Sequence, residues 1–437
     1  MMKPTLVVLV TLLAQQFSPL CLAQDESKEA KKPDAEQLRE LLFDLSDIRF
    51  KELSADDGNI RFLLDVKQLT DHDNEDIGSF YQRVYLHHRG FDKPVLINTN
   101  GYNLSQGKHE LVDLLDANYI SVEHRYFGPS TPKPREWKYL TIQQAAGDYH
   151  NIRKVLGRIY KGKWVSTGIS KGGETCTYYR HFYPDDVVAT VPYVAPFPNG
   201  FKDQRFYKFL DTAGSQECHD RIHQFQLSVL KHKDELVPRM KYYLKGRGAS
   251  VDLIGGPEAA LELFVMEFPF AFWQGGKKWE DVPDSEASVD DLIDYFIANR
   301  ELWYILDKST KNLAAHYYQH ATQLGYYAYR AEKFGDLIEK WDGEPSACLF
   351  REDEELTFDP ATIGKMAEWL KTDAEDIVFL YGGLDTWTVA QARLGTNKKV
   401  SKYVFDGKHH GNARLSDVDE KLRKEILKKL KAMMNNP

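Results

Sequence analysis

The segment Gly168-Ile169-Ser170-Lys171-Gly172 places a serine between two glycines, after a β-branched run and before a stretch of helical composition. This is the order strand, Gly-x-Ser-x-Gly, helix of a nucleophile elbow. The turn is so tight that side chains two positions before and after the serine would collide, and Gly168 and Gly172 remove them. We expect the Ser170 hydroxyl at a helix N-terminus, where the helix dipole and free N–H groups favour developing negative charge.

An activated serine needs a base and an acid that orients the base. In the α/β-hydrolase arrangement the acid and then the histidine follow the serine, each after a later strand. Asp385 follows the apolar run 377–381, and the pair His409-His410 follows the run 402–406. We predict Ser170 as nucleophile, Asp385 as orienting acid and His409 as base, with His410 as the alternative. Taken singly, Asp385 is also typical of a helix N-cap, and the histidine pair of a surface loop.

Two backbone N–H groups should bind the oxyanion that such a reaction forms. One belongs to Lys171, the residue after the nucleophile. The other comes from the loop after the third strand, Asn98-Thr99-Asn100-Gly101-Tyr102, where a glycine lets the backbone approach the substrate. We assign this second donor to the N–H of Tyr102. Alternatively, the segment is an ordinary Asn-Gly turn.

The elements that must position these residues alternate between strand-like and helical patterns, which predicts a mostly parallel sheet with helices on both faces. Between about 200 and 345 the pattern changes, because apolar residues fall at helical spacing and Tyr, Phe and Trp are frequent. We therefore predict an α/β-hydrolase fold over 59–199 and 346–437. A helical cap at 200–345 is inserted before the strand that carries Asp385.

The N-terminus has the pattern of an export signal. Lys3 precedes a short apolar stretch, and Cys21-Leu22-Ala23 ends in a small residue, as a signal peptidase requires. We predict a signal peptide at 1–23, a charged leader at 24–58 and a periplasmic or secreted mature protein without a membrane segment. Alternatively, Cys21 is a lipid-attachment site. The net charge of −8 and the predicted export disfavour nucleic-acid binding.

Three cysteines remain after the predicted cleavage. Cys176 lies in the predicted helix after Ser170, where a small buried side chain fits. Cys218 and Cys348 flank the predicted cap, so a disulfide between them would join its two ends in an oxidising compartment. Alternatively, all three are free thiols.

At these residues the chain resembles the secreted bacterial prolyl tri/tetrapeptidyl aminopeptidases, which are related to lysosomal prolyl carboxypeptidase and dipeptidyl peptidase II. The resemblance runs from about residue 60 to the C-terminus. The matching segments are Asn98-Thr99-Asn100-Gly101-Tyr102, Glu123-His124-Arg125-Tyr126-Phe127-Gly128, Thr141-Ile142-Gln143-Gln144-Ala145, the elbow, Gly383-Leu384-Asp385 with Trp387, and His409-His410. Lys171 and Thr386 stand where the lysosomal enzymes carry an aromatic residue and a proline, which agrees better with the bacterial aminopeptidases.

The resemblance implies a serine exopeptidase that forms an acyl-enzyme on Ser170. It would release short peptides, tripeptides above all, from free N-termini, with proline at the scissile bond. A dipeptidyl peptidase and a prolyl carboxypeptidase-like enzyme are the alternatives, and an esterase with the same triad is a more distant one. No cofactor is implied, and the sequence shows no metal-ligand spacing.

An aminopeptidase must bind the free α-ammonium, which calls for a carboxylate in a partly dehydrated pocket. Glu267 is the first candidate, because its aromatic neighbours, Trp273 among them, can pack against a proline ring. Glu123 is the second candidate, and Trp387 is a further predicted substrate contact. Alternatively, Glu267 caps a helix or pairs with a basic residue of the cap.

Overall fold

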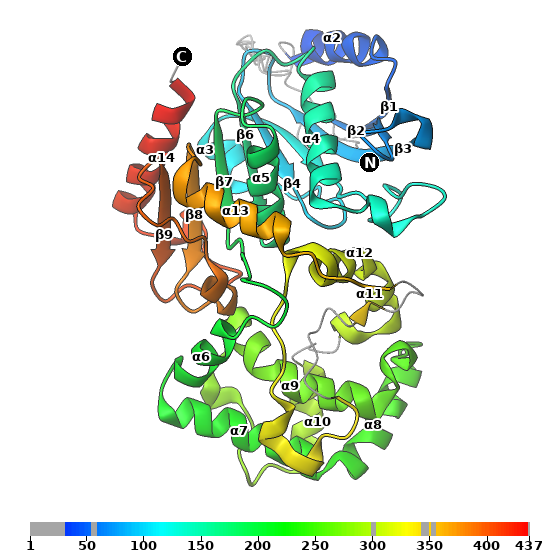
Figure 1. The fold of residues 1–437 in the computed structure, drawn as a ribbon, viewed down its shortest axis with the longest axis vertical. Helices are drawn as coiled ribbons and strands as arrows, with labels where there is room; N and C mark the ends of the chain where they lie inside the picture. The colour runs from blue at the N-terminus through cyan, green and yellow to red at the C-terminus, as the bar shows by residue number, and fades with distance from the viewer. Residues whose placement is uncertain (1–30, 54–58, 299–302, 342–348, 351–354, 436–437) are drawn as a thin grey trace, which may run out of the picture.

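The computed structural model describes residues 31–53, 59–298, 303–341, 349–350 and 355–435. The predicted signal peptide and Cys348 lie outside these residues. An upper lobe holds the sheet and a lower lobe is helical (Figure 1). No helix in the described ranges is long and apolar enough to cross a bilayer.

The described strands form one nine-stranded sheet in the order β1-β2-β3-β5-β4-β6-β7-β8-β9. Pairing is antiparallel from β1 to β5 and parallel from β5 through β4 to β9. The central strands are buried on both faces, which explains their continuous apolar runs. The strands are β1 (Ile48–Leu53), β2 (Ile60–Leu69), β3 (Ser79–His88), β4 (Val95–Thr99), β5 (Asn118–Val122), β6 (Trp164–Ile169), β7 (Ala189–Tyr193), β8 (Ile377–Gly382) and β9 (Val400–Phe405).

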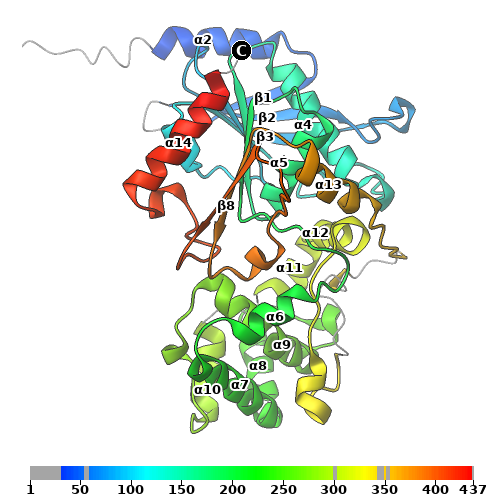
Figure 2. The same ribbon diagram turned by 60° about the vertical axis from the view of Figure 1, so that its left-hand side comes forward.

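Helices cover both faces of the sheet (Figure 2). The apolar sides of α3 and α14 pack on one face, against alternate residues of β8 such as Val378 and Leu380. The apolar sides of α4, α5 and α13 pack on the other face, where Ile377 and Phe379 point. These helices are α3 (Glu110–Leu114), α4 (Ile142–Leu156), α5 (Lys171–Phe182), α13 (Ala361–Thr372) and α14 (Glu420–Asn435). The predicted α/β-hydrolase fold is confirmed.

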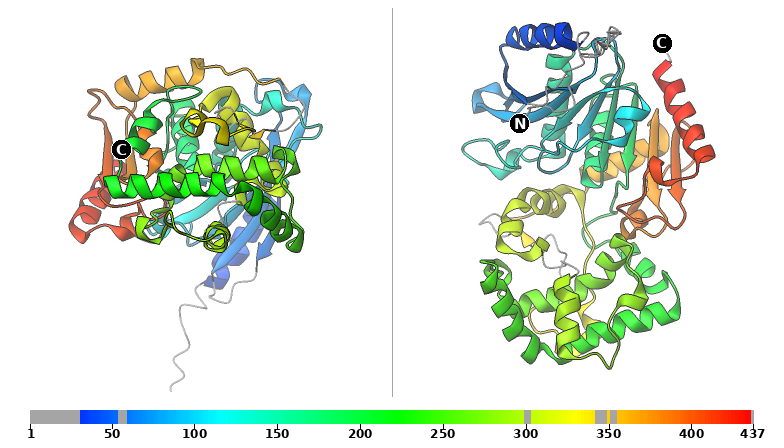
Figure 3. Two further views of the ribbon diagram at one scale, coloured as in Figure 1. Left: turned by 90° about the horizontal axis from the view of Figure 1, so that it is seen from below. Right: turned by 180° about the vertical axis from the view of Figure 1, so that it is seen from behind.

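The cap is the helical lobe between β7 and β8, and it lies at one end of the sheet (Figure 3). Its interior is an aromatic cluster that extends into the sheet domain through Phe127, Trp137 and Trp387. The cap therefore packs on the loops at that end of the sheet. Its helices are α6 (Arg205–Thr212), α7 (Gln216–Lys231), α8 (Lys233–Gly246), α9 (Pro257–Gly275), α10 (Val289–Ala298), α11 (Asp307–Asn312) and α12 (Ala314–Gln319).

Part of the expected leader belongs to the sheet domain. Residues 31–53 form α2 (Lys31–Phe43) and the edge strand β1, which pairs with β2. Leu38 and Leu42 lie one helical turn apart and are fully buried against the sheet. The bidentate ion pair of Arg39 with Glu52 joins the helix to the strand. The charged composition that indicated a leader comes from the exposed face of this helix.

Candidate active site

Ser170 stands at the turn from β6 into α5 in a conformation that few residues adopt, with φ 58° and ψ −125°. Such backbone strain is typical of functional positions. Glycine is required at positions 168 and 172 because a side chain there would collide with the backbone. A Cβ on Gly168 would lie 2.2 Å from the carbonyl oxygen of Gly172. The elbow geometry that the motif predicts is therefore present, and it exposes the serine at the N-terminus of α5.

The oxyanion loop, residues 99–102 after β4, packs backbone to backbone on the elbow. A Cβ on Gly101, which has φ 74°, would lie 2.6 Å from the Gly172 nitrogen, and one on Gly172 would lie 2.5 Å from the Thr99 oxygen. The Thr99 hydroxyl also donates a 2.8 Å hydrogen bond to the Gly172 carbonyl. Within the described residues, the N–H groups of Tyr102 and Lys171 have no hydrogen-bond acceptor. Both predicted oxyanion donors are thus adjacent to Ser170 and uncommitted.

Asp385 is paired with His410. Its Oδ2 lies 2.7 Å from Nδ1 of His410, and its Oδ1 accepts from the backbone N–H of Trp387 at 3.1 Å. Asp385 is thus both a cap of the short helix after β8 and the partner of a histidine. With the Nδ1 proton directed at the carboxylate, Nε2 of His410 is left to accept a proton.

The serine is not hydrogen-bonded to the histidine in the described part of this structure. Among the described residues no hydrogen bond joins Ser170 to His410, and the side chain of Tyr102 interacts with Ser170 instead. Catalytic hydrogen bonds are often long in unliganded enzymes and shorten when substrate binds.

His409, the base that the sequence analysis prefers, points elsewhere. Its Nδ1 accepts from the N–H of Gly411 at 3.2 Å, and its ring packs against Gly276 at the end of α9. A Cβ on Gly276 would lie 2.3 Å from this ring. The assignment is therefore corrected to the alternative, His410. Neighbouring residues of a turn point to different sides, and their order along the chain does not say which one faces the acid.

Glu123 is buried and hydrogen-bonded to the loops around it. One carboxylate oxygen accepts from the N–H of Leu104 at 3.1 Å and the other from the hydroxyl of Ser130 at 2.7 Å. Gly128 lies so close that a Cβ there would be 2.9 Å from Oε1. These contacts hold Glu123 between two loops of the sheet domain, and its binding of an ammonium group stays a prediction.

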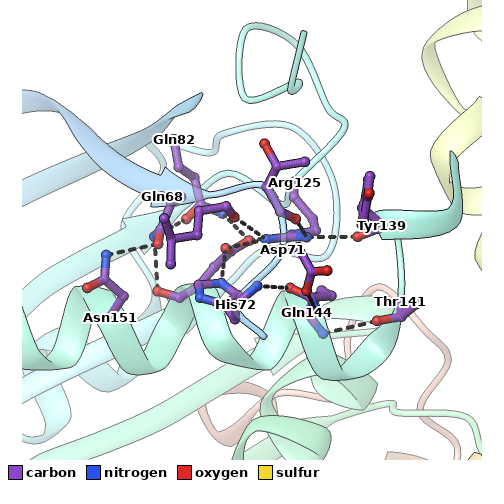
Figure 4. A network of polar contacts seen from close by, with 12 residues as sticks. Gln68, Asp71, His72, Gln82, Arg125, Tyr139, Thr141, Gln144 and Asn151 are labelled. Carbon is purple, nitrogen blue, oxygen red and sulfur yellow. Dashed lines mark hydrogen bonds and ion pairs between the residues drawn. The ribbon is translucent and has the colours of Figure 1, made fainter. Parts of the chain in front are cut away.

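The rest of the Glu123–Gly128 motif is structural. The guanidinium of the fully buried Arg125 forms two 2.7 Å hydrogen bonds with Asp148 of α4. Its other N–H groups donate to the carbonyls of Leu69, Thr70 and Tyr139. Figure 4 shows this network, in which Gln68, His72 and Gln82 join the same cluster. The motif therefore fixes the loop after β5 to α4 and to the end of β2.

Glu267 lies inside the cap, in the middle of α9, and is 8% exposed. Tyr327 donates to both of its carboxylate oxygens at 2.9 Å, and Tyr329 donates to Oε2 at 2.8 Å. No basic side chain of the described residues forms an ion pair with it. Burial raises the pKa of Glu267 to about 7, although the hydrogen bonds from the two tyrosines counter part of this effect. It lies inside the helix, so it is no helix cap, and none of the described Lys and Arg residues of the cap pairs with it.

The two candidate tryptophans lie in the aromatic cluster near Glu267. The ring of Trp387 lies 5.0 Å from that of Phe270 and 5.5 Å from that of Tyr327. Trp273 lines a pocket of about 290 Å³ in the cap, together with Phe270, Tyr327 and other residues. The hydroxyl of Thr386 donates to the carbonyl of Phe270 at 3.0 Å, which ties the Asp385 loop to α9.

Sequence reasoning missed Tyr327 and Tyr329 as the partners of Glu267. They alternate along an extended segment, so their side chains share one side. The run Tyr326-Tyr327-Ala328-Tyr329 was the available signal, but nothing in the sequence pairs it with a carboxylate sixty positions earlier. Cys176 and Cys218 are both buried. Because Cys348 lies outside the described residues, the disulfide with Cys218 stays a prediction.

Comparison with known proteins decides the family. Residues 31–428 match the model of the PS-10 peptidase S37 family. The chain belongs to this family. It is also 30% identical to the prolyl tri/tetrapeptidyl aminopeptidase of Streptomyces mobaraensis, over 93% of this chain and 87% of that protein. The predicted resemblance is confirmed, and we conclude that this PS-10 peptidase S37 member is a serine peptidase.

Two further matches are weaker. A putative serine protease of Caenorhabditis elegans is 34% identical over 18% of this chain and 16% of that protein. A solved proline iminopeptidase of Mycobacterium smegmatis is 13% identical and covers 88% of this chain and 99% of its own, with a TM-score of 0.40. Both likenesses are too limited to bear on the chemistry of this chain.

Proposed function

We propose that the protein is a serine aminopeptidase that releases short peptides, tripeptides above all, from free N-termini by cleavage after proline. The observation that carries this proposal is Glu267, a buried cap carboxylate whose hydrogen-bond partners, within the part of the chain that the structure describes, are tyrosines and not a basic residue. A carboxylate in such a place lacks a counter-ion that a peptide α-ammonium would supply. The name of the Streptomyces relative supports the same substrate class.

The position of Glu267 suits an anchor for the first residue of a substrate. Tyr317 interacts electrostatically both with Glu267 and with Tyr102. Tyr102 in turn interacts with Ser170. These interactions link the surroundings of the carboxylate to those of the nucleophile through Tyr317 and Tyr102. Since an extended chain spans at most about 3.5 Å per residue, the separation of anchor and nucleophile sets how many residues are released.

The chemistry we propose is acyl transfer at Ser170. His410 Nε2 takes the hydroxyl proton as Oγ attacks the peptide carbonyl, while Asp385 holds the imidazole and stabilises the imidazolium that forms. The N–H groups of Lys171 and Tyr102 bind the oxyanion. His410 then gives its proton to the leaving amine, and water hydrolyses the acyl-enzyme through the same steps.

Cleavage of a chromogenic panel tests this function. The panel contains nitroanilides of Ala-Ala-Pro, Ala-Pro and Pro with free and acetylated N-termini, and a short-chain ester. We expect rapid release from free Ala-Ala-Pro, little from its acetylated form, and none with Ser170→Ala. Preference for free Ala-Pro would replace the tripeptide assignment with a dipeptidyl peptidase. Cleavage of the ester alone would refute the peptidase proposal.

We further propose that the N-terminal segment directs export and is removed after Ala23. The pattern of Lys3, the short apolar stretch and the small residue at position 23 supports this. Mass spectrometry of the mature protein should find an N-terminus at Gln24. A lipid on Cys21, or retention of Met1, would contradict the proposal.

A further inference from the structure

The side chain of Lys171 turns back under the oxyanion loop. It is 2% exposed, and its Nζ lies 2.9 Å from the carbonyl oxygen of Gly101. The ring centres of Tyr102 and Phe127 lie 5.8 and 5.7 Å from the same nitrogen. The mechanism above uses only the backbone N–H of Lys171, so it gives no reason for burying an amine here.

The carbonyl that Lys171 holds belongs to the same peptide group as the proposed oxyanion donor. The C=O of Gly101 and the N–H of Tyr102 lie in one planar trans peptide and point in opposite directions. A donor that fixes the oxygen therefore fixes the direction of the N–H on the other side. The following carbonyl, that of Tyr102, accepts from the N–H of His124 at 2.9 Å. Both peptide groups that flank Tyr102 are thus held in place.

The basic side chains of Lys171 and Arg125 lie in this region, and Arg125 is neutralised by its ion pair with Asp148. Burial lowers the pKa of His124, His316 and His320 from the usual value, so these rings are neutral at neutral pH. Burial also lowers the pKa of Lys171 to about 7, an effect that Glu174, one turn along α5, opposes. The ammonium form draws electron density from the Gly101 oxygen and makes the Tyr102 N–H a stronger donor, since linked hydrogen bonds reinforce one another.

We propose that Lys171 is a positioning residue for the oxyanion hole, whose side-chain nitrogen orients and polarises the Gly101–Tyr102 peptide toward the developing oxyanion. This inference rests on the proposed acyl transfer at Ser170. Because negative charge on the substrate oxygen develops in the transition state, the contribution appears in kcat and much less in KM.

Labelling of Ser170 by a fluorophosphonate tests this role without peptide recognition. The Ser170 Oγ forms a bond to phosphorus, fluoride leaves, and the hydroxyl proton passes to His410. Lys171→Met removes Nζ and keeps most of the apolar stem. We expect labelling and kcat to fall about 10- to 100-fold, less than the loss of a donor itself would cost, with KM within about twofold. The melting temperature should stay the same or rise, because a buried amine has been removed.

The pH profile separates this role from a merely structural one. Labelling by the wild type should fall as pH passes through the range where Lys171 loses its charge, near 7 and above. The Lys171→Met variant should lack the alkaline fall. Should this variant fail to fold, Lys171→Gln gives the same test, because its side chain keeps a neutral donor and has no charge to lose, so it must also lack the alkaline fall.

Thr177→Val is the matched control. Thr177 is equally buried on α5, and its hydroxyl donates to the Gly173 carbonyl, away from the oxyanion loop. The Thr177→Val variant should be labelled at the same rate as the wild type. The inference would be overturned if Lys171→Met were labelled as fast as the wild type, or if its labelling rate still fell at alkaline pH. If the wild type is labelled but cleaves no peptide of the panel, the proposed function fails while this test remains valid.

Discussion

The two halves of the candidate site are held in place by different means. In the sheet domain, the elbow and the oxyanion loop meet backbone to backbone, at Gly101, Gly168 and Gly172, where a single added carbon would collide. In the cap, Glu267 is held by tyrosine hydroxyls within a cluster of aromatic rings. Short-range backbone geometry therefore positions the catalytic half of the site. The recognition half depends on side chains brought together from distant segments.

The largest effect should separate the two histidines after β9. His410→Ala removes the group that faces Asp385, and kcat should fall by about 10⁴- to 10⁶-fold, as for other triad histidines. His409→Ala, whose ring contacts Gly276 of the cap, should change kcat by less than about tenfold. Steady-state rates on free Ala-Ala-Pro nitroanilide measure both. A larger loss in His409→Ala than in His410→Ala would reverse the assignment of the base.

Ion pairs offer a second contrast between sheet domain and cap. Asp148→Asn leaves the buried Arg125 without its counter-ion, which should lower the free energy of unfolding by about 3–5 kcal/mol. Asp211→Asn in the cap weakens an exposed pair with Arg330 and should cost no more than about 1 kcal/mol. Denaturant unfolding gives the free energy of unfolding of both variants. Equal losses of this free energy would show that burial does not decide how much an ion pair contributes.

Glycine substitutions probe the backbone contact directly. Gly101→Ala adds a carbon 2.6 Å from the Gly172 nitrogen at a positive φ, so we expect a loss of about 2–4 kcal/mol of stability. Gly364→Ala, on the exposed side of α13 with open space around it, should stabilise the protein by up to about 1 kcal/mol. Thermal unfolding of both variants gives the comparison. An unperturbed Gly101→Ala would mean that the loop can move away from the elbow.

The stability of the protein and its KM should both depend on pH through the protonation of Glu267. Its folded pKa of about 7 exceeds its usual 4.5, so this group favours the folded state most below pH 4.5 and loses that contribution as pH rises through about 7. Glu267→Gln should therefore be more stable than the wild type at pH 8, by at most about 3 kcal/mol, and similar at pH 4.5. KM of the wild type should rise as pH falls below 7, since the protonated carboxyl no longer attracts an ammonium. Equal stability of the two proteins at both pH values would contradict this environment for Glu267.

Much of the catalytic half could be predicted from the sequence, because a nucleophile elbow leaves so little space that glycine becomes obligatory at fixed positions. Asp385 and the histidine pair could be predicted because each follows an apolar strand-like run in the order that the fold requires. Which histidine faces Asp385 could not be predicted, since it depends on the path of the turn through Gly411. The partner of Glu123 could not be predicted either, because Ser130 approaches it only when the loop after β5 folds back on itself. The tyrosines around Glu267 come from a distant segment, a contact that periodicity does not show.

The central claim is that the sheet domain performs the chemistry and Glu267 of the cap selects a free N-terminus. The most direct test is the ratio of kcat/KM for free over acetylated Ala-Ala-Pro nitroanilide, in the wild type and in Glu267→Gln. We predict a large ratio in the wild type and a ratio close to one in the variant, with fluorophosphonate labelling of Ser170 unchanged. A ratio that stays large in Glu267→Gln, with labelling intact, would show that another group binds the α-ammonium and would contradict the account.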